Sequence, residues 1–176
     1  MKIGRLMTPT IEIVFTKSKK KLPIFSWLIR AWTNKPYSHV ARAVPRRDWG
    51  KGYYHASEGK VHYEFETLFK KKHEIVKKYL LEVPKELEME VRRACWEDSG
   101  KKYATMQNLG IVLIDIARLF GVKLTNPWKD GRNCSELLYL KVFKQLKPEL
   151  DYDPDTIKPH HIEEIIETHF QDLIRD

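Results

Sequence analysis

A cysteine at the start of an apolar helical segment is the feature that most constrains this chain. Residues 130–133, Asp-Gly-Arg-Asn, favour a turn, and the apolar helical pattern begins at Cys134 and continues through Leu137 and Leu138. The unpaired N–H groups and the positive end of a helix stabilise a thiolate over a thiol. The pattern therefore predicts Cys134 as a nucleophile, provided that the fold brings a base to it.

Two histidines in strand-like segments are the candidate partners. His39 lies in the run Tyr-Ser-His-Val and His55 in the run Tyr-His-Ala-Ser. An imidazole beside a thiol takes its proton and later protonates the leaving group, while a second side chain holds the ring. We assign the base to His39 and the orienting role to His55. Glu58, His62 and Glu64 are close in sequence to His55 and could orient His39 instead, and Glu58 and Glu64 are the alternative third catalytic residues.

Together these motifs resemble the circularly permuted branch of the papain-like, NlpC-type cysteine hydrolases. In the unpermuted family the nucleophile precedes the two histidine strands, whereas the order here is His39, His55, Cys134. Two positions depart from the family pattern: Ala41 replaces the usual glycine after Ser-His-Val, and Glu136 replaces the glycine after Cys-Ser. The resemblance implies an α+β fold in which a small antiparallel sheet packs against the nucleophile helix and flanking helices.

The resemblance also implies a reaction and a substrate class. Relatives act on peptidoglycan peptides, isopeptide-linked protein tags or lipid acyl groups, so we expect hydrolysis of an amide or peptide carbonyl through a thioester, on a peptide, cell-wall or lipid substrate. Tyr103 resembles a Gly-x-x-Tyr element that lines the family's pocket, and the Cys134 N–H would hold the oxyanion. No cofactor or metal is expected, because adjacent His160 and His161 would point about 100° apart on a helix.

The remaining patterning indicates one domain over residues 1–176. A chain of 176 residues with 42% hydrophobic content buries a core without disulfides, and it has only two cysteines. The expected strands cover 11–15, 38–44, 52–57, 61–66 and 75–83, and the expected helices cover 23–32, 85–99, 105–120, 134–144 and 160–174.

The location expected from the sequence is cytoplasmic. Residues 1–10 lack the apolar run of a signal peptide. Residues 109–124 form the most apolar stretch, but Asp115 and Arg118 interrupt it, and each would cost roughly 2.5 to 3.5 kcal/mol near a bilayer centre. A buried helix, rather than a transmembrane span, is therefore predicted there.

A net charge of +8 leaves two alternative functions open. Such an excess attracts anionic surfaces, although no helix-turn-helix or ribonucleoprotein motif predicts specific nucleic-acid binding. One alternative is a lipid acyltransferase or thioesterase of the lecithin retinol acyltransferase type, with the basic and aromatic stretch 19–32 on a membrane surface. The other is a non-catalytic basic binding module on the same fold.

Overall fold

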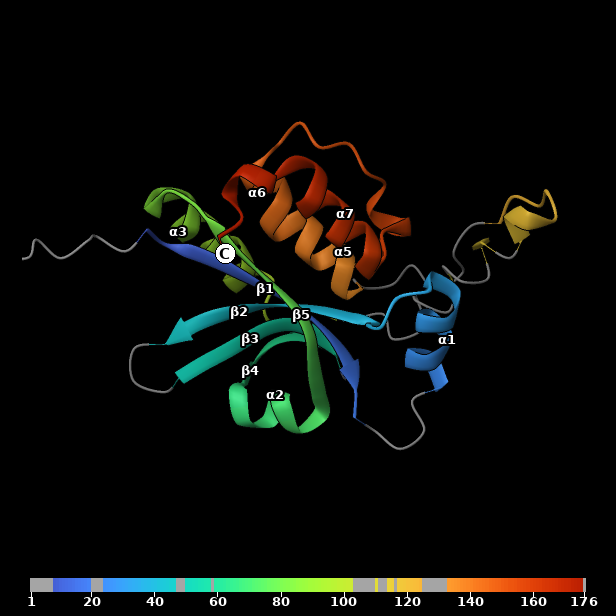
Figure 1. Cartoon of the computed structure of the whole chain (residues 1–176), viewed down its shortest axis with the longest axis horizontal. Coiled ribbons are helices and arrows are strands. Elements are labelled where there is room, and N and C mark those ends of the chain that lie inside the picture. Colours follow the sequence, from blue (N-terminus) through green and yellow to red (C-terminus); the bar gives the residue numbers. More distant parts are fainter. Residues whose placement is uncertain are drawn as a thin grey trace, which may run out of the picture.

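The chain folds around a five-stranded antiparallel sheet in the strand order β4-β3-β2-β1-β5 (Figure 1). The computed structural model describes residues 8–19, 24–46, 50–57, 59–102, 110, 114–115, 117–124 and 133–175. The strands are β1 (Thr10–Ser18), β2 (His39–Arg46), β3 (Gly50–Ser57), β4 (Lys60–Phe65) and β5 (His73–Glu82). With its helices, this sheet makes the described part of the chain an α+β structure, as the sequence predicted.

Helices cover both faces of the sheet. In Figure 1, α3, α5, α6 and α7 lie over one face, which we call the α5 face, and α2 lies under the other, which we call the α2 face. The helices are α1 (Ile24–Thr33), α2 (Glu66–Lys72), α3 (Lys85–Glu97), α5 (Cys134–Leu138), α6 (Lys144–Leu146) and α7 (Pro159–His169). Three short turns of helix complete them: the π-helix η1 (Tyr139–Phe143) and the 3-10 helices η2 (Pro154–Thr156) and η3 (Gln171–Leu173).

The alternation of side chains along each strand divides the core into two parts. Neighbouring residues of a strand point to opposite faces, so Ile13 and Phe15 join the large core under the α5 face, whereas Val14 joins a small core on the α2 face. In the small core, the Tyr53 ring stacks on Phe69 of α2 with a centroid distance of 4.0 Å. Because both faces are covered, consecutive residues are buried in the central strands, as Ile13, Val14, Phe15 and Thr16 are in β1.

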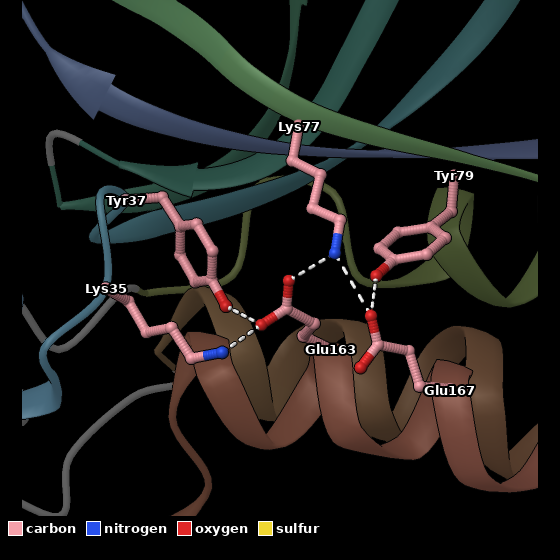
Figure 2. Close-up of polar contacts among 6 residues, drawn as sticks. All are labelled: Lys35, Tyr37, Lys77, Tyr79, Glu163 and Glu167. Atoms are coloured by element: carbon pink, nitrogen blue, oxygen red, sulfur yellow. Dashed lines mark hydrogen bonds and ion pairs between the residues drawn. The ribbon is translucent and has the colours of Figure 1, made fainter.

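Helix α7 is attached to the sheet by a network of charged and tyrosine side chains (Figure 2). Glu163 accepts hydrogen bonds from Lys35 and Tyr37 at 2.5 Å and from Lys77 at 2.7 Å. Glu167 accepts from Lys77 at 3.0 Å and also from Tyr79. Burial alone would raise the pKa of Glu163, but the hydrogen bonds from Lys35, Lys77 and Tyr37 lower it to about 2.

Replacing Glu163 by glutamine is expected to destabilise the fold in a pH-dependent way. The Glu163 pKa falls from 4.5 to about 2 on folding, so its stabilising effect is complete above pH 4.5 and disappears as the pH falls toward 2. We expect Glu163→Gln to lower the free energy of unfolding by about 1 to 3 kcal/mol at pH 7 and by much less at pH 2. Urea unfolding at both pH values measures this, with exposed Glu164→Gln as the control. An equal loss at both pH values would contradict the ionic origin of the effect.

Candidate functional site

Four histidines, one from each of four strands, gather on the α2 face of the sheet. His39 begins β2, His73 begins β5, and His55 in β3 is paired with His62 in β4 across the antiparallel ladder. Residues two apart on a strand share a face, which places Glu64 beside His62. The strand register alone therefore brings these four imidazoles and one carboxylate together.

The structure brings the two predicted histidines into direct contact. His39 Nε2 and His55 Nδ1 are 3.0 Å apart, a hydrogen-bonding distance. The His39 ring also stacks on the His73 ring with a centroid distance of 5.0 Å, and the His55 ring meets Phe69 edge-on at 5.1 Å. Burial, followed by the neighbouring charges of His73, His55 and His62, holds the pKa of His39 well below its usual value. His39 is therefore neutral near pH 7, as a general base must be.

Glu64 lies on the far side of His55 from His39. Its Oε2 atom is 3.5 Å from His55 Nε2, which is longer than an ordinary hydrogen bond and makes this mainly an electrostatic contact. Its Oε1 atom accepts a hydrogen bond from Lys72 at 2.7 Å. His55 and then Lys72 lower the pKa of Glu64 to about 2, against the opposing effect of burial. Of the two alternative third residues, Glu64 thus contacts the histidine pair, and Glu58 lies outside the described residues.

Cys134 is the first residue of α5, as its sequence context predicted. Asn133 Oδ1 accepts the backbone N–H groups of Ser135 and Glu136, both at 2.8 Å, and the Glu136 side chain accepts the Asn133 N–H at 3.4 Å. This reciprocal arrangement is a capping box, which satisfies N–H groups that a helix start leaves unpaired. The Glu136 carboxylate, at the position where the NlpC-type sequence pattern has glycine, therefore has a structural role in this cap.

The thiol of Cys134 is more buried than the sequence indicated. Its exposed fraction is 1%. Burial raises the pKa of Cys134 above its ordinary value, although hydrogen bonding to the backbone of Val40 and to Ser135 acts in the opposite direction. The stabilisation expected from a helix start is thus present, but desolvation outweighs it. In this conformation the side chain is a thiol, not a thiolate.

Cys134 and the histidine pair lie on opposite faces of β2. The thiol belongs to the core under the α5 face together with Val40 and Tyr54, whereas His39 and His55 face α2. The sulfur lies near the Val40 backbone, one residue from His39. The structure therefore places the expected nucleophile next to the strand that carries the expected base, but on its other side. The catalytic role of Cys134 stays a prediction.

Other residues named from the sequence have different outcomes. Tyr103 lies outside the described residues. Cys95 is buried in α3, where Arg42 Nη1 lies 3.5 Å from its sulfur and burial raises its pKa. His73 was not predicted at all, and no local signal marks it, since its place in the cluster depends on β5 pairing with β1.

Two groups of side chains in the described part of the chain have the composition and spacing of a metal site. One consists of His39, His55 and His73, and the other of His55, His62 and Glu64. Within each group the potential ligand atoms lie within 4.8 Å of one another. Both groups are on the α2 face and share His55.

The comparisons with known proteins bear on the fold. No protein-family model matches the chain, and no curated protein matches it. Among solved structures, the chain is similar to one described as the metalloprotein yiiX from Escherichia coli O157:H7, DUF1105. The two are 17% identical with a TM-score of 0.52, and the match covers 95% of this chain and 86% of the other. At this identity the likeness shows a shared fold and nothing about activity.

The described residues contain no candidate for a membrane-spanning helix. None of the helices there is both long enough and apolar enough to cross a bilayer. Two tryptophans of α1 are nevertheless exposed, Trp27 by 59% and Trp32 by 40%. Trp32 uses its indole Nε1 to donate to Asp115 at 3.0 Å, which leaves Trp27 as the more accessible of the two.

Proposed function

We propose that this chain is a cysteine hydrolase of the permuted papain-like type, which cleaves an amide or peptide bond through a thioester on Cys134. The observation that carries the proposal is the 3.0 Å hydrogen bond between His39 Nε2 and His55 Nδ1, on the strand that also contacts the Cys134 helix start. The order of the three sequence motifs, His39, His55 and then Cys134, is the second support.

The contacts of His55 suggest which ring nitrogen of each histidine carries a proton in the proposed catalytic state. If His55 Nε2 carries a proton, that proton faces the Glu64 carboxylate, and His55 Nδ1 accepts from His39 Nε2. His39 Nδ1 is then unprotonated and is the basic atom. Glu64 and His55 thus act as positioning residues, since each fixes the tautomer of the next ring without touching the substrate.

Catalysis requires the thiol and His39 Nδ1 to meet on one side of the strand. The His39 ring lies on the α2 face, so the start of β2, where His39 is the first residue, would have to rearrange to bring the ring to the sulfur. His39 Nδ1 then takes the thiol proton as sulfur attacks the carbonyl carbon, and the developing oxyanion binds the Cys134 N–H. The imidazolium protonates the leaving amine, and water, deprotonated by His39, cleaves the thioester.

Alkylation of the two cysteines tests the proposal without a known substrate. We expect iodoacetamide to modify Cys134 at least about 10-fold faster than Cys95 near neutral pH, because the proposed mechanism brings the His39 base to Cys134 and brings no base to Cys95. His39→Ala should remove that difference, and His55→Gln should reduce it in part. Mass spectrometry of the two cysteine peptides measures both rates in one sample. Equally slow modification of both cysteines would contradict the proposal and favour a non-catalytic binding module.

A lipid-directed variant of the same chemistry is the second candidate. The exposure of Trp27, in a helix that follows the Lys19 to Lys21 run, favours it specifically. An aromatic side chain enters the interfacial region of a bilayer while nearby lysines meet anionic head groups. The reaction at Cys134 would be the same, with an ester or thioester of a lipid as the substrate.

A further inference from the structure

We propose that His55, His62 and Glu64 form a binding site for one divalent transition-metal ion of the Zn²⁺ type. Two imidazoles and one carboxylate are a common ligand set for such ions, which leaves a further coordination position for water or substrate. The ligand atoms of the three residues lie within 4.8 Å of one another. The site goes beyond the hydrolase proposal, because metal binding at this place does not require Cys134.

The backbone register places these ligands on rigid elements. His55 and His62 are directly paired residues of β3 and β4, and their ring centroids are 4.8 Å apart. Glu64 follows His62 by two residues and therefore points to the same face. His55 and Glu64 are both buried beneath α2, where little side-chain freedom remains to be lost when a metal binds.

Three polar atoms of this ligand set are buried without a hydrogen bond. His55 Nε2, His62 Nδ1 and Glu64 Oε2 are each buried without a hydrogen-bond partner among the described residues, and the first and third of these atoms lie 3.5 Å apart in an electrostatic contact. Buried polar groups of folded proteins are normally hydrogen-bonded, so three such atoms in one cluster call for an explanation. Each atom belongs to a residue of this ligand set, and a single cation would satisfy all three.

Neighbouring side chains also contact the atoms of His55 and Glu64 that point away from the proposed metal. His55 Nδ1 contacts His39 Nε2 at 3.0 Å, and Glu64 Oε1 accepts from Lys72 at 2.7 Å. Such outer contacts orient metal ligands and select the histidine tautomer. A metal requires His55 with its proton on Nδ1 and the lone pair of Nε2 directed toward Glu64 and His62, which is the opposite tautomer to the one proposed for catalysis.

The other histidine group is less suited to a metal. His39 and His55 already use the facing atoms Nε2 and Nδ1 for their mutual hydrogen bond. His73 Nδ1 lies 3.5 Å from the Thr16 hydroxyl. A metal between His39, His55 and His73 would have to break the first of these contacts, whereas a metal on His55, His62 and Glu64 keeps it.

Zinc titration of the metal-free full chain tests the site. We expect isothermal titration calorimetry to show one Zn²⁺ per chain, and His62→Ala and Glu64→Gln to weaken its binding by at least about 10- to 100-fold. His73→Ala, which changes only the other histidine group, is the matched control and should bind as the wild type does. Thermal midpoints without zinc establish that each variant is folded.

Cobalt substitution supplies a second measurement. Co²⁺ bound by two imidazoles and a carboxylate absorbs visible light, and we expect His62→Ala to lose this absorption. Absence of zinc binding in the wild type, or unchanged binding in both ligand variants, would overturn the proposal. Loss of binding in His73→Ala with retention in His62→Ala would also overturn it in favour of the other group. Cys134→Ala should bind zinc normally, so failure of the hydrolase proposal and failure of the metal site are distinguishable.

Discussion

Cys134→Ala is expected to abolish turnover, with kcat/KM reduced by about 10,000-fold or more while the fold is retained. Removal of a catalytic nucleophile leaves only binding and oxyanion contacts, which account for a small part of the rate enhancement. The measurement is hydrolysis of a panel of peptide amides and lipid esters by wild type and variant. Cys134-dependent hydrolysis of peptide amides would support the peptidase proposal, and Cys134-dependent hydrolysis of lipid esters would support the lipid-directed variant.

Cys95→Ala is the matched control for this experiment, because both cysteines are buried and only one is at a helix start. It should retain wild-type kcat/KM even if its thermal midpoint is lowered. Circular dichroism shows whether Cys134→Ala keeps the native secondary structure. Equal activity of wild type and Cys134→Ala on any substrate that the chain turns over would exclude Cys134 as the nucleophile.

The strands and the two histidines could be predicted from the sequence because their signals are local. Alternating apolar residues mark β1, and turn residues separate the strands. His39 and His55 each lie in a strand-like run, and adjacent antiparallel strands bring such residues together. In the structure His39 Nε2 and His55 Nδ1 lie 3.0 Å apart, while the catalytic roles of the two histidines stay predictions.

The surroundings of the pair were not predictable, because they depend on contacts between distant segments. Helix α2 has seven residues and buries only Phe69, so it has no amphipathic repeat to reveal it, and the sequence predicted no helix there. Yet α2 covers the histidine face and provides Lys72 to Glu64. The face of the sheet on which Cys134 lies is likewise determined by the packing of α5 on β2, and the residues next to Cys134 in the sequence do not indicate which face this is.

The expected helix over 134–144 shows a similar limit. The structure has α5, then the π-helix η1, then α6 in this region. A π-helical turn shifts the backbone hydrogen bonds by one residue, and the apolar pattern of Leu137, Leu138 and Val142 fits both arrangements. Tyr139, which donates its hydroxyl to the Leu150 carbonyl at 2.8 Å, is positioned by this turn.

Glu88→Ala is expected to produce the largest loss of stability, about 3 to 5 kcal/mol in the free energy of unfolding. Arg42 of β2 and Glu88 of α3 form an ion pair with Nη2 and Oε1 2.8 Å apart, and their side chains are only 1% and 9% exposed. Without Glu88, the Arg42 guanidinium remains inside the α5-face core, with the weakly accepting Cys95 sulfur 3.5 Å away. An unpaired buried charge costs far more than the pair contributed.

Urea unfolding at pH 7 measures this loss, and Glu90→Ala is the control, because Glu90 is an exposed residue of the same helix. The control should lower the free energy of unfolding by less than about 0.5 kcal/mol. The double variant Arg42→Met with Glu88→Leu should recover most of the stability, since an apolar pair of similar volume avoids the desolvation of both charges. If Glu88→Ala lowered the free energy of unfolding no more than Glu90→Ala does, the prediction would be wrong. Arg42 would then have to reach water in the native state, and the packing of α3 on β2 would not depend on this ion pair.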